Sequence, residues 1–177
     1  MANVTNEVQE AQKAIDFETN TYELIFETSM GTINLEFYPD IAPGHCANMI
    51  ALAKIGYYDN VTFHRIVPGF VIQGGCPDGT GMGGPGYTVD AEFNDRPHLP
   101  GILSMARTND PNSAGSQFFL CLEKVPFLDN QYTVFGKTSD EASLEVVKAI
   151  GAVKTGAQDK PLEDVVIKKA TVTEKAK

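Results

Sequence analysis

The chain has 177 residues, of which 42% are hydrophobic and 21% are charged, as expected for one globular domain. With 23 acidic and 14 basic residues its formal net charge is −9, so it lacks the positive surface by which proteins bind nucleic acid or an anionic membrane. No apolar run is long enough to span a bilayer.

The three cysteines are far apart and form no C-x-x-C pair. An odd number of separated cysteines argues against a disulfide framework and indicates a reducing compartment. We expect each to be a small core or surface residue rather than a nucleophile. The first 20 residues are polar and lack the apolar segment of a secretory signal peptide, so we expect a cytoplasmic protein.

The first 20 residues carry only weak helical spacing, at Val4, Val8, Ala11 and Ile15. We expect a frayed or loosely docked extension over residues 1–20, followed by the folded domain over residues 21–177. Residues 22–28 and 32–38 alternate apolar and polar side chains on either side of Met30-Gly31, which predicts a β-hairpin.

Pro43 opens a helical stretch that reaches about Ile55. Short strands are predicted at 62–66, 70–73, 101–106, 117–121 and 132–135. The pattern Thr138-x-x-Glu141 is typical of a capping box and predicts a second helix that ends near Gly151, before a closing strand around Ile167. Short strands, two helices and Gly/Pro-rich turns favour a closed, mainly antiparallel β-barrel with helices over its ends.

Residues 79–84 match G-x-G-x-x-G, a pattern of dinucleotide-binding loops. In those proteins the loop leads directly into a helix that holds the pyrophosphate, whereas here Pro85-Gly86 follows and the chain extends. We therefore interpret this segment as a flexible surface loop. The histidines, at 45, 64 and 98, lack the spacing of metal ligands, so neither a metal nor another cofactor is expected.

Three apolar strand segments each contain one long polar side chain, namely Arg65, Gln73 and Gln117. A buried Arg is rare unless it is paired, so a single Arg in a strand would be expected to reach solvent or meet a carboxylate. Three such residues can instead hydrogen-bond one another and present a planar, charged group at an apolar cleft.

The segments around these residues resemble the signature motifs of the cyclophilin family of peptidyl-prolyl isomerases. The matching segments are residues 63–75 (FHRIVPGFVIQGG), 101–106 (GILSMA), 111–119 (PNSAGSQFF), 127–129 (FLD) and 134–137 (VFGK). The resemblance covers about residues 22–172 and is closest to bacterial members. It implies an eight-stranded antiparallel β-barrel capped by two α-helices, which agrees with the pattern of predicted elements.

The resemblance implies that Arg65 is the catalytic residue and that Gln73 orients its guanidinium or binds the substrate backbone. The partners it implies are proline-containing polypeptides, and we expect the protein to be a monomer. The implied substrate-binding residues form a pocket for the proline ring and flank the substrate chain: Phe70, Val71, Gln73, Ala106, Arg107, Gln117, Phe119, Phe127, Leu128 and Tyr132.

Four of these positions depart from common family residues. Phe127 replaces a Trp found at the pocket rim of many members, and Val71, Arg107 and Tyr132 replace Met, Asn and His. The chain contains no tryptophan, so the rim offers no indole N–H donor. We therefore expect cyclosporin, the cyclic peptide inhibitor of the family, to bind with reduced affinity.

Two other functions fit the same predicted barrel. A non-catalytic peptide-binding or chaperone module would bind proline-containing chains without accelerating isomer exchange. A lipocalin-like barrel would enclose a small-molecule cavity lined by its inward phenylalanines. The set of Arg65, Gln73 and Phe119 favours a third interpretation, an isomerase that acts on unfolded or flexible chains and assists their folding.

Overall fold

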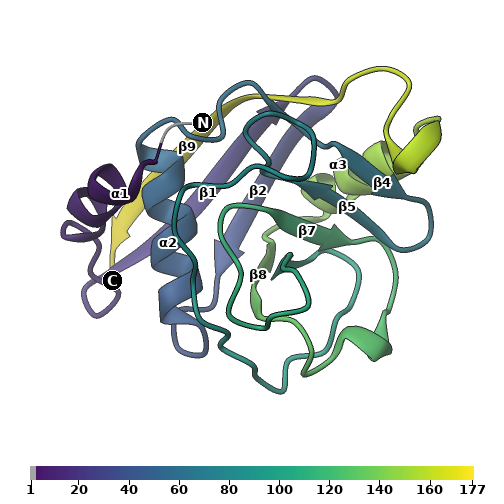
Figure 1. Ribbon diagram of the computed structural model, residues 1–177. Coiled ribbons are helices and arrows are strands. Elements are labelled where there is room, and N and C mark those ends of the chain that lie inside the picture. Colours follow the sequence, from purple (N-terminus) through teal and green to yellow (C-terminus); the bar gives the residue numbers. More distant parts are fainter. Residues whose placement is uncertain (1–2) are drawn as a thin grey trace.

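A computed structural model describes residues 3–177, which form one strongly curled antiparallel sheet with helices packed on it (Figure 1). The strand order is β3-β9-β1-β2-β8-β6-β7-β5-β4. The strands are β1 (Asn20–Thr28), β2 (Gly31–Phe37), β3 (Val61–Thr62), β4 (Arg65–Val67), β5 (Val71–Gly74), β6 (Ile102–Met105), β7 (Phe118–Cys121), β8 (Val134–Thr138) and β9 (Val166–Ala176). The helices are α1 (Thr5–Gln12), α2 (Pro43–Lys54), α3 (Glu141–Gly151) and the 3-10 turns η1 (Pro126–Leu128) and η2 (Ala157–Asp159). None of the helices in this part of the chain is long and apolar enough to cross a membrane.

Most of the predicted elements are confirmed. Strands β1 and β2 pair as an antiparallel hairpin, and α2 begins at Pro43. The predicted strand 62–66 is interrupted at Phe63 and His64 and forms the two short strands β3 and β4. Helix α3 is capped by Asp140, whose carboxylate accepts a hydrogen bond from Ser143 N at 2.7 Å, and not by Thr138.

The predicted barrel is correct in being mainly antiparallel β but wrong in three details. The sheet of residues 3–177 has nine strands rather than eight. Its edge strands, β3 and β4, pair with β9 and β5 and not with each other, so the curled sheet is not closed by hydrogen bonds. Three α-helices pack on the sheet instead of two, and the additional one is α1.

Helix α1 lies where we expected a frayed or loosely docked segment. Its Val8 is only 2% exposed and belongs to the main hydrophobic core, and Val4, Ala11 and Ile15 pack against that core. Figure 1 shows α1 and α2 side by side, and the two helices are in contact. The weak helical spacing of this segment therefore marks a docked helix.

Hydrophobic side chains fill the interior of the curled sheet. One row of inward residues crosses β4, β5, β7 and β6 and is fully buried: Ile66, Ile72, Leu120 and Leu103. Next to it Phe118 stacks on Phe26 at a centroid distance of 5.4 Å and meets Phe63 edge to face at 5.9 Å. Because the inward phenylalanines contact one another, they do not line a ligand cavity, and the lipocalin-like interpretation is wrong.

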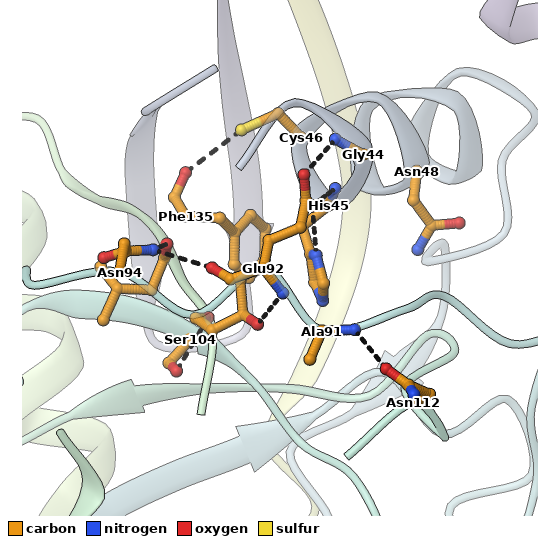
Figure 2. Close-up of polar contacts among 12 residues, drawn as sticks. Gly44, His45, Cys46, Asn48, Ala91, Glu92, Asn94, Ser104, Asn112 and Phe135 are labelled. Carbon is orange, nitrogen blue, oxygen red and sulfur yellow. Dashed lines mark hydrogen bonds and ion pairs between the residues drawn. The ribbon is translucent and has the colours of Figure 1, made fainter. Parts of the chain in front are cut away.

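A carboxylate from a distant loop caps helix α2. The N-cap residue, Ala42, offers no capping side chain. Glu92 instead accepts hydrogen bonds from the backbone N–H groups of Gly44 and His45, at 3.1 and 2.7 Å, and from His45 Nδ1 at 2.6 Å (Figure 2). Burial raises the pKa of Glu92, but the bonds from His45 and Gly44 outweigh it and hold the pKa below its ordinary value. The loop that carries Glu92 is thereby fixed to α2.

Candidate active site

A second row of side chains crosses the same strands next to the buried one and faces outward. Arg65 of β4 pairs with Gln73 of β5, Gln73 with Phe119 of β7, and Phe119 with Ser104 of β6. Residues directly opposite one another on neighbouring strands project from the same face of a sheet. The strand register therefore aligns a cation, an amide and an aromatic ring on the outside of the sheet.

A pocket of about 250 Å³ lies over this row. Its lining contains the predicted catalytic residue and nine of the ten predicted substrate-binding residues: Arg65, Phe70, Val71, Gln73, Ala106, Arg107, Phe119, Phe127, Leu128 and Tyr132. The remaining one, Gln117, lines a neighbouring groove. The fold thus brings together residues that are up to 67 positions apart in the sequence.

Hydrogen bonds orient the guanidinium of Arg65. Its Nη1 donates to Gln73 Oε1 at 3.3 Å, and Gln73 Nε2 donates to Gln117 Oε1 at 3.1 Å. Gln117 Nε2 in turn donates to the carbonyl oxygens of Gly81 and Gly83, at 2.9 and 3.0 Å. Between residues 3 and 177 no carboxylate lies within ion-pair distance of Arg65, so its positive charge is available to a ligand.

The floor of the pocket is apolar and its rim is exposed. Phe119, Leu128 and Val71 are 5%, 7% and 2% exposed, so they form a preformed hydrophobic floor. The ring of Tyr132 meets that of Phe119 edge to face at 5.7 Å. At the rim Phe127, which is 70% exposed, stacks on Phe70 at 5.6 Å. The pocket can therefore bury a small apolar ring beside the guanidinium.

His98 supports Phe119 from behind, a role that we did not predict from the sequence. The two rings stack with an interplanar angle of 16°. Asp129 Oδ1 lies 2.8 Å from His98 N and 2.9 Å from its Nδ1, and Ser104 Oγ lies 2.9 Å from Nε2. Burial lowers the pKa of His98, and the Ser104 hydroxyl beside Nε2 donates to the carbonyl oxygen of Thr133 at 3.0 Å.

Arg107 does not compete with Arg65 for a ligand. Its guanidinium donates to the carbonyl oxygens of Gln131 and Thr108 and lies 4.5 Å from the centroid of the Tyr132 ring. The side chain therefore fastens the opposite wall of the pocket. The backbone N–H of Ala106 donates to Gln117 O at 3.0 Å, and within residues 3–177 its carbonyl oxygen has no donor, which leaves it free for a bound chain.

A larger groove of about 800 Å³ continues from the pocket and shares Gln73, Ala106 and Arg107 with it. Its far wall is the glycine-rich segment 81–86, which we call the glycine wall. No helix follows this segment, in contrast to the loops of dinucleotide-binding proteins. The wall rests on Cys76, whose Sγ accepts hydrogen bonds from Gly81 N at 3.2 Å and Gly83 N at 3.3 Å. All three cysteines are free and buried.

Residues 23–172 match the family model described as cyclophilin type peptidyl-prolyl cis-trans isomerase/CLD. Over 128 residues the chain is 52% identical to a peptidyl-prolyl cis-trans isomerase of Synechococcus elongatus, a match that covers 72% of this chain and 88% of that protein. It is 45% identical over 160 residues to peptidyl-prolyl cis-trans isomerase-like 1 of Gibberella zeae, covering 87% of this chain and 96% of the relative.

The fold is also similar to a solved structure. A cyclophilin type peptidyl-prolyl cis-trans isomerase of Cryptosporidium parvum, crystallised in the presence of the dipeptide Ala-Pro, superimposes with a TM-score of 0.80 at 34% sequence identity. The match covers 85% of this chain and 98% of the crystallised one. The similarity therefore extends over most of this chain and nearly the whole of the crystallised one.

The buried His98 predicts how stability depends on pH. Because burial lowers its pKa in the folded protein, the unfolded chain binds a proton more readily below the ordinary value of 6.5. The free energy of unfolding should therefore fall as the pH drops from 7.5 to 5.5, and a His98→Gln variant should lose part of that dependence. Urea unfolding at both pH values measures the two slopes. Equal slopes in wild type and variant would show that His98 is not held neutral.

Proposed function

This chain belongs to the cyclophilin-type peptidyl-prolyl cis-trans isomerases, and we propose that it accelerates rotation about X–Pro bonds in unfolded or flexible chains, with Arg65 as the catalytic group. The observation that carries the proposal is the orientation of the unpaired Arg65 guanidinium, by Gln73 and Gln117, beside the apolar floor that includes Phe119. The proposed role is to assist folding steps whose rate is limited by proline isomerisation.

The chemistry needs a cation more than it needs a nucleophile. Rotation about a peptide bond breaks amide resonance, a barrier of about 18–20 kcal/mol, and no covalent bond forms or breaks. In the twisted state the proline nitrogen becomes pyramidal and basic, so a fixed donor stabilises that state more than either planar isomer. An arginine stays charged and planar at any working pH, and this mechanism requires no cofactor.

In the proposed complex each part of the pocket has one task. The proline ring lies on the floor of Val71, Phe119 and Leu128 and is thereby held while the preceding peptide group rotates. Arg65 lies beside the rotating bond and donates to the proline nitrogen or to the moving carbonyl oxygen. The free carbonyl oxygen of Ala106 accepts a hydrogen bond from the substrate backbone.

The remaining expectations from the sequence belong to the same proposal. The substrates are proline-containing polypeptides, and the protein acts as a cytoplasmic monomer that binds neither nucleic acid nor membranes. The Cryptosporidium protein was crystallised in the presence of Ala-Pro, a dipeptide whose apolar ring matches the floor of this pocket. A purely peptide-binding or chaperone module on the same fold would leave the unpaired charge of Arg65 without a use.

Replacing Arg65 tests the proposal. Arg65→Lys keeps the charge but loses the planar fork held by Gln73, so kcat/KM should fall about 100-fold, as for loss of one transition-state donor. A proline-limited refolding assay measures the loss, and Arg96→Lys, on an exposed Arg that lies 4.2 Å from the Tyr38 ring centroid, is the matched control. Equal acceleration by wild type and Arg65→Lys would exclude Arg65 as the catalyst, and peptide binding without any acceleration would favour the chaperone module.

The rim residue predicts the response to cyclosporin. Phe127 is exposed and has no N–H group, so adding an indole donor at this position should strengthen binding by about three- to tenfold, the value of one hydrogen bond. Calorimetric titration of wild type and Phe127→Trp with cyclosporin measures the two Kd values. If the two Kd values agree, the rim donor does not control inhibitor affinity.

A further inference from the structure

The N-terminal segment touches the glycine wall of the substrate groove. Val4 N donates to the carbonyl oxygen of Pro85 at 3.0 Å, and Asn3 Nδ2 donates to that of Gly86 at 3.4 Å. The approach is so close that a Cβ on Gly86 would lie 2.6 Å from Asn3 Cγ, and Gly86 has a φ of +93°. Only glycine fits the wall at this contact.

The same segment is anchored to the body of the protein. Asn3 Oδ1 accepts a hydrogen bond from Thr5 N at 2.9 Å, so the residue that touches Gly86 is also bonded to the first residue of helix α1. One turn later Val8 is buried in the core, and α1 packs on α2. The contact with the wall is therefore the end of a fixed helix rather than of a loose tail.

The glycine wall has no regular secondary structure and depends on side chains around it. Gln117 holds it from the groove side, and Cys76 holds it from beneath. Just after the wall, the Tyr87 hydroxyl donates to Asn48 of α2. Val4 and Asn3 hold its outer end. On the groove side the wall carries Met82, which is 90% exposed and offers an apolar contact to a bound chain.

We propose that residues 3–12 form a specificity element that fixes the glycine wall and thereby selects substrates by their residues outside the X–Pro bond. The inference rests on the proposed function, because it places the X–Pro bond at Arg65. A dipeptide fills only the pocket around Arg65, whereas a longer chain also enters the groove beside the wall. The segment lies outside residues 23–172, which match the family model.

Two variants loosen this element in different ways. Val4→Pro removes the N–H that donates to Pro85 and keeps Val8, the buried residue of α1, unchanged. Val8→Asp places a charge in the core and undocks the helix. Glu7→Gln, on an exposed residue of the same helix, is the control. If Val8→Asp fails to fold, Val4→Pro alone decides the outcome.

Exchange NMR on two substrates provides the measurement: a blocked Ala-Pro dipeptide and an eight-residue peptide with one central Ala-Pro bond. Both variants should lower kcat/KM for the longer peptide about fivefold or more and leave the dipeptide unchanged. An unchanged rate with the longer peptide, or an equal loss with both substrates, would overturn the inference.

Amide resonances of the wild-type protein separate this inference from the function on which it rests. The longer peptide should shift resonances both at Phe119 and at Gly81–Gly86. A shift at Phe119 without one at the wall would overturn the specificity element and leave the proposed site standing. No shift at Phe119 would overturn both.

Discussion

The register of three short strands, β4, β5 and β7, determines both faces of the sheet at once. It aligns Arg65, Gln73 and Phe119 outward and, one residue further along, Ile66, Ile72 and Leu120 inward. Because side chains alternate along a strand, a slip of one residue would bury the guanidinium and expose the isoleucines. An unpaired buried cation costs several kcal/mol, so the hydrophobic core and the site specify each other.

The register places Arg65, but side chains from other segments orient it. A free arginine loses up to about 2 kcal/mol of rotamer entropy when it is held in one position. Arg65 loses this entropy during folding and not on ligand binding, because Gln73 and Gln117 hold the guanidinium before a ligand arrives. Gln117 itself depends on the carbonyl oxygens of Gly81 and Gly83. Gly81 and Gly83 are also held by Cys76, independently of Asn3 and Val4, and preorganisation of this kind favours the transition state.

Local sequence patterns predict the elements of this fold that depend on a few neighbouring residues. The alternation around Met30-Gly31 predicts the hairpin, and Pro43 predicts the start of α2, because both signals lie within a few residues. The prediction and the structure differ at the cap of α3, where Asp140 and not Thr138 caps the helix. Two acceptor side chains lie two residues apart, and tertiary contacts, such as that of Asp140 with Asn34, determine which of them is the cap. Helix α1 has a weak pattern because a single buried residue, Val8, docks it.

The same difference between local and long-range signals applies to the site. Motif resemblance located the residues that line the pocket, and the polar side chains of Arg65, Gln73 and Gln117 suggested the network that joins them. The support of Phe119 by His98 depends on strand pairing between segments that are far apart in sequence, so no local pattern carries it. The docking of Val4 on Pro85 is equally distant in sequence and is visible only in three dimensions.

The central claim is that an oriented guanidinium, and not a charged residue in general, lowers the rotational barrier. Exchange NMR of one short X–Pro peptide with wild type and with Gln73→Ala tests it most directly, because the variant keeps Arg65 and removes the amide that aims it. The catalysed exchange rate at saturating peptide should fall about tenfold, the value of a charge-assisted hydrogen bond. Peptide-induced shifts at Phe119 should persist and show that the pocket still binds. An undiminished exchange rate in Gln73→Ala would contradict the claim.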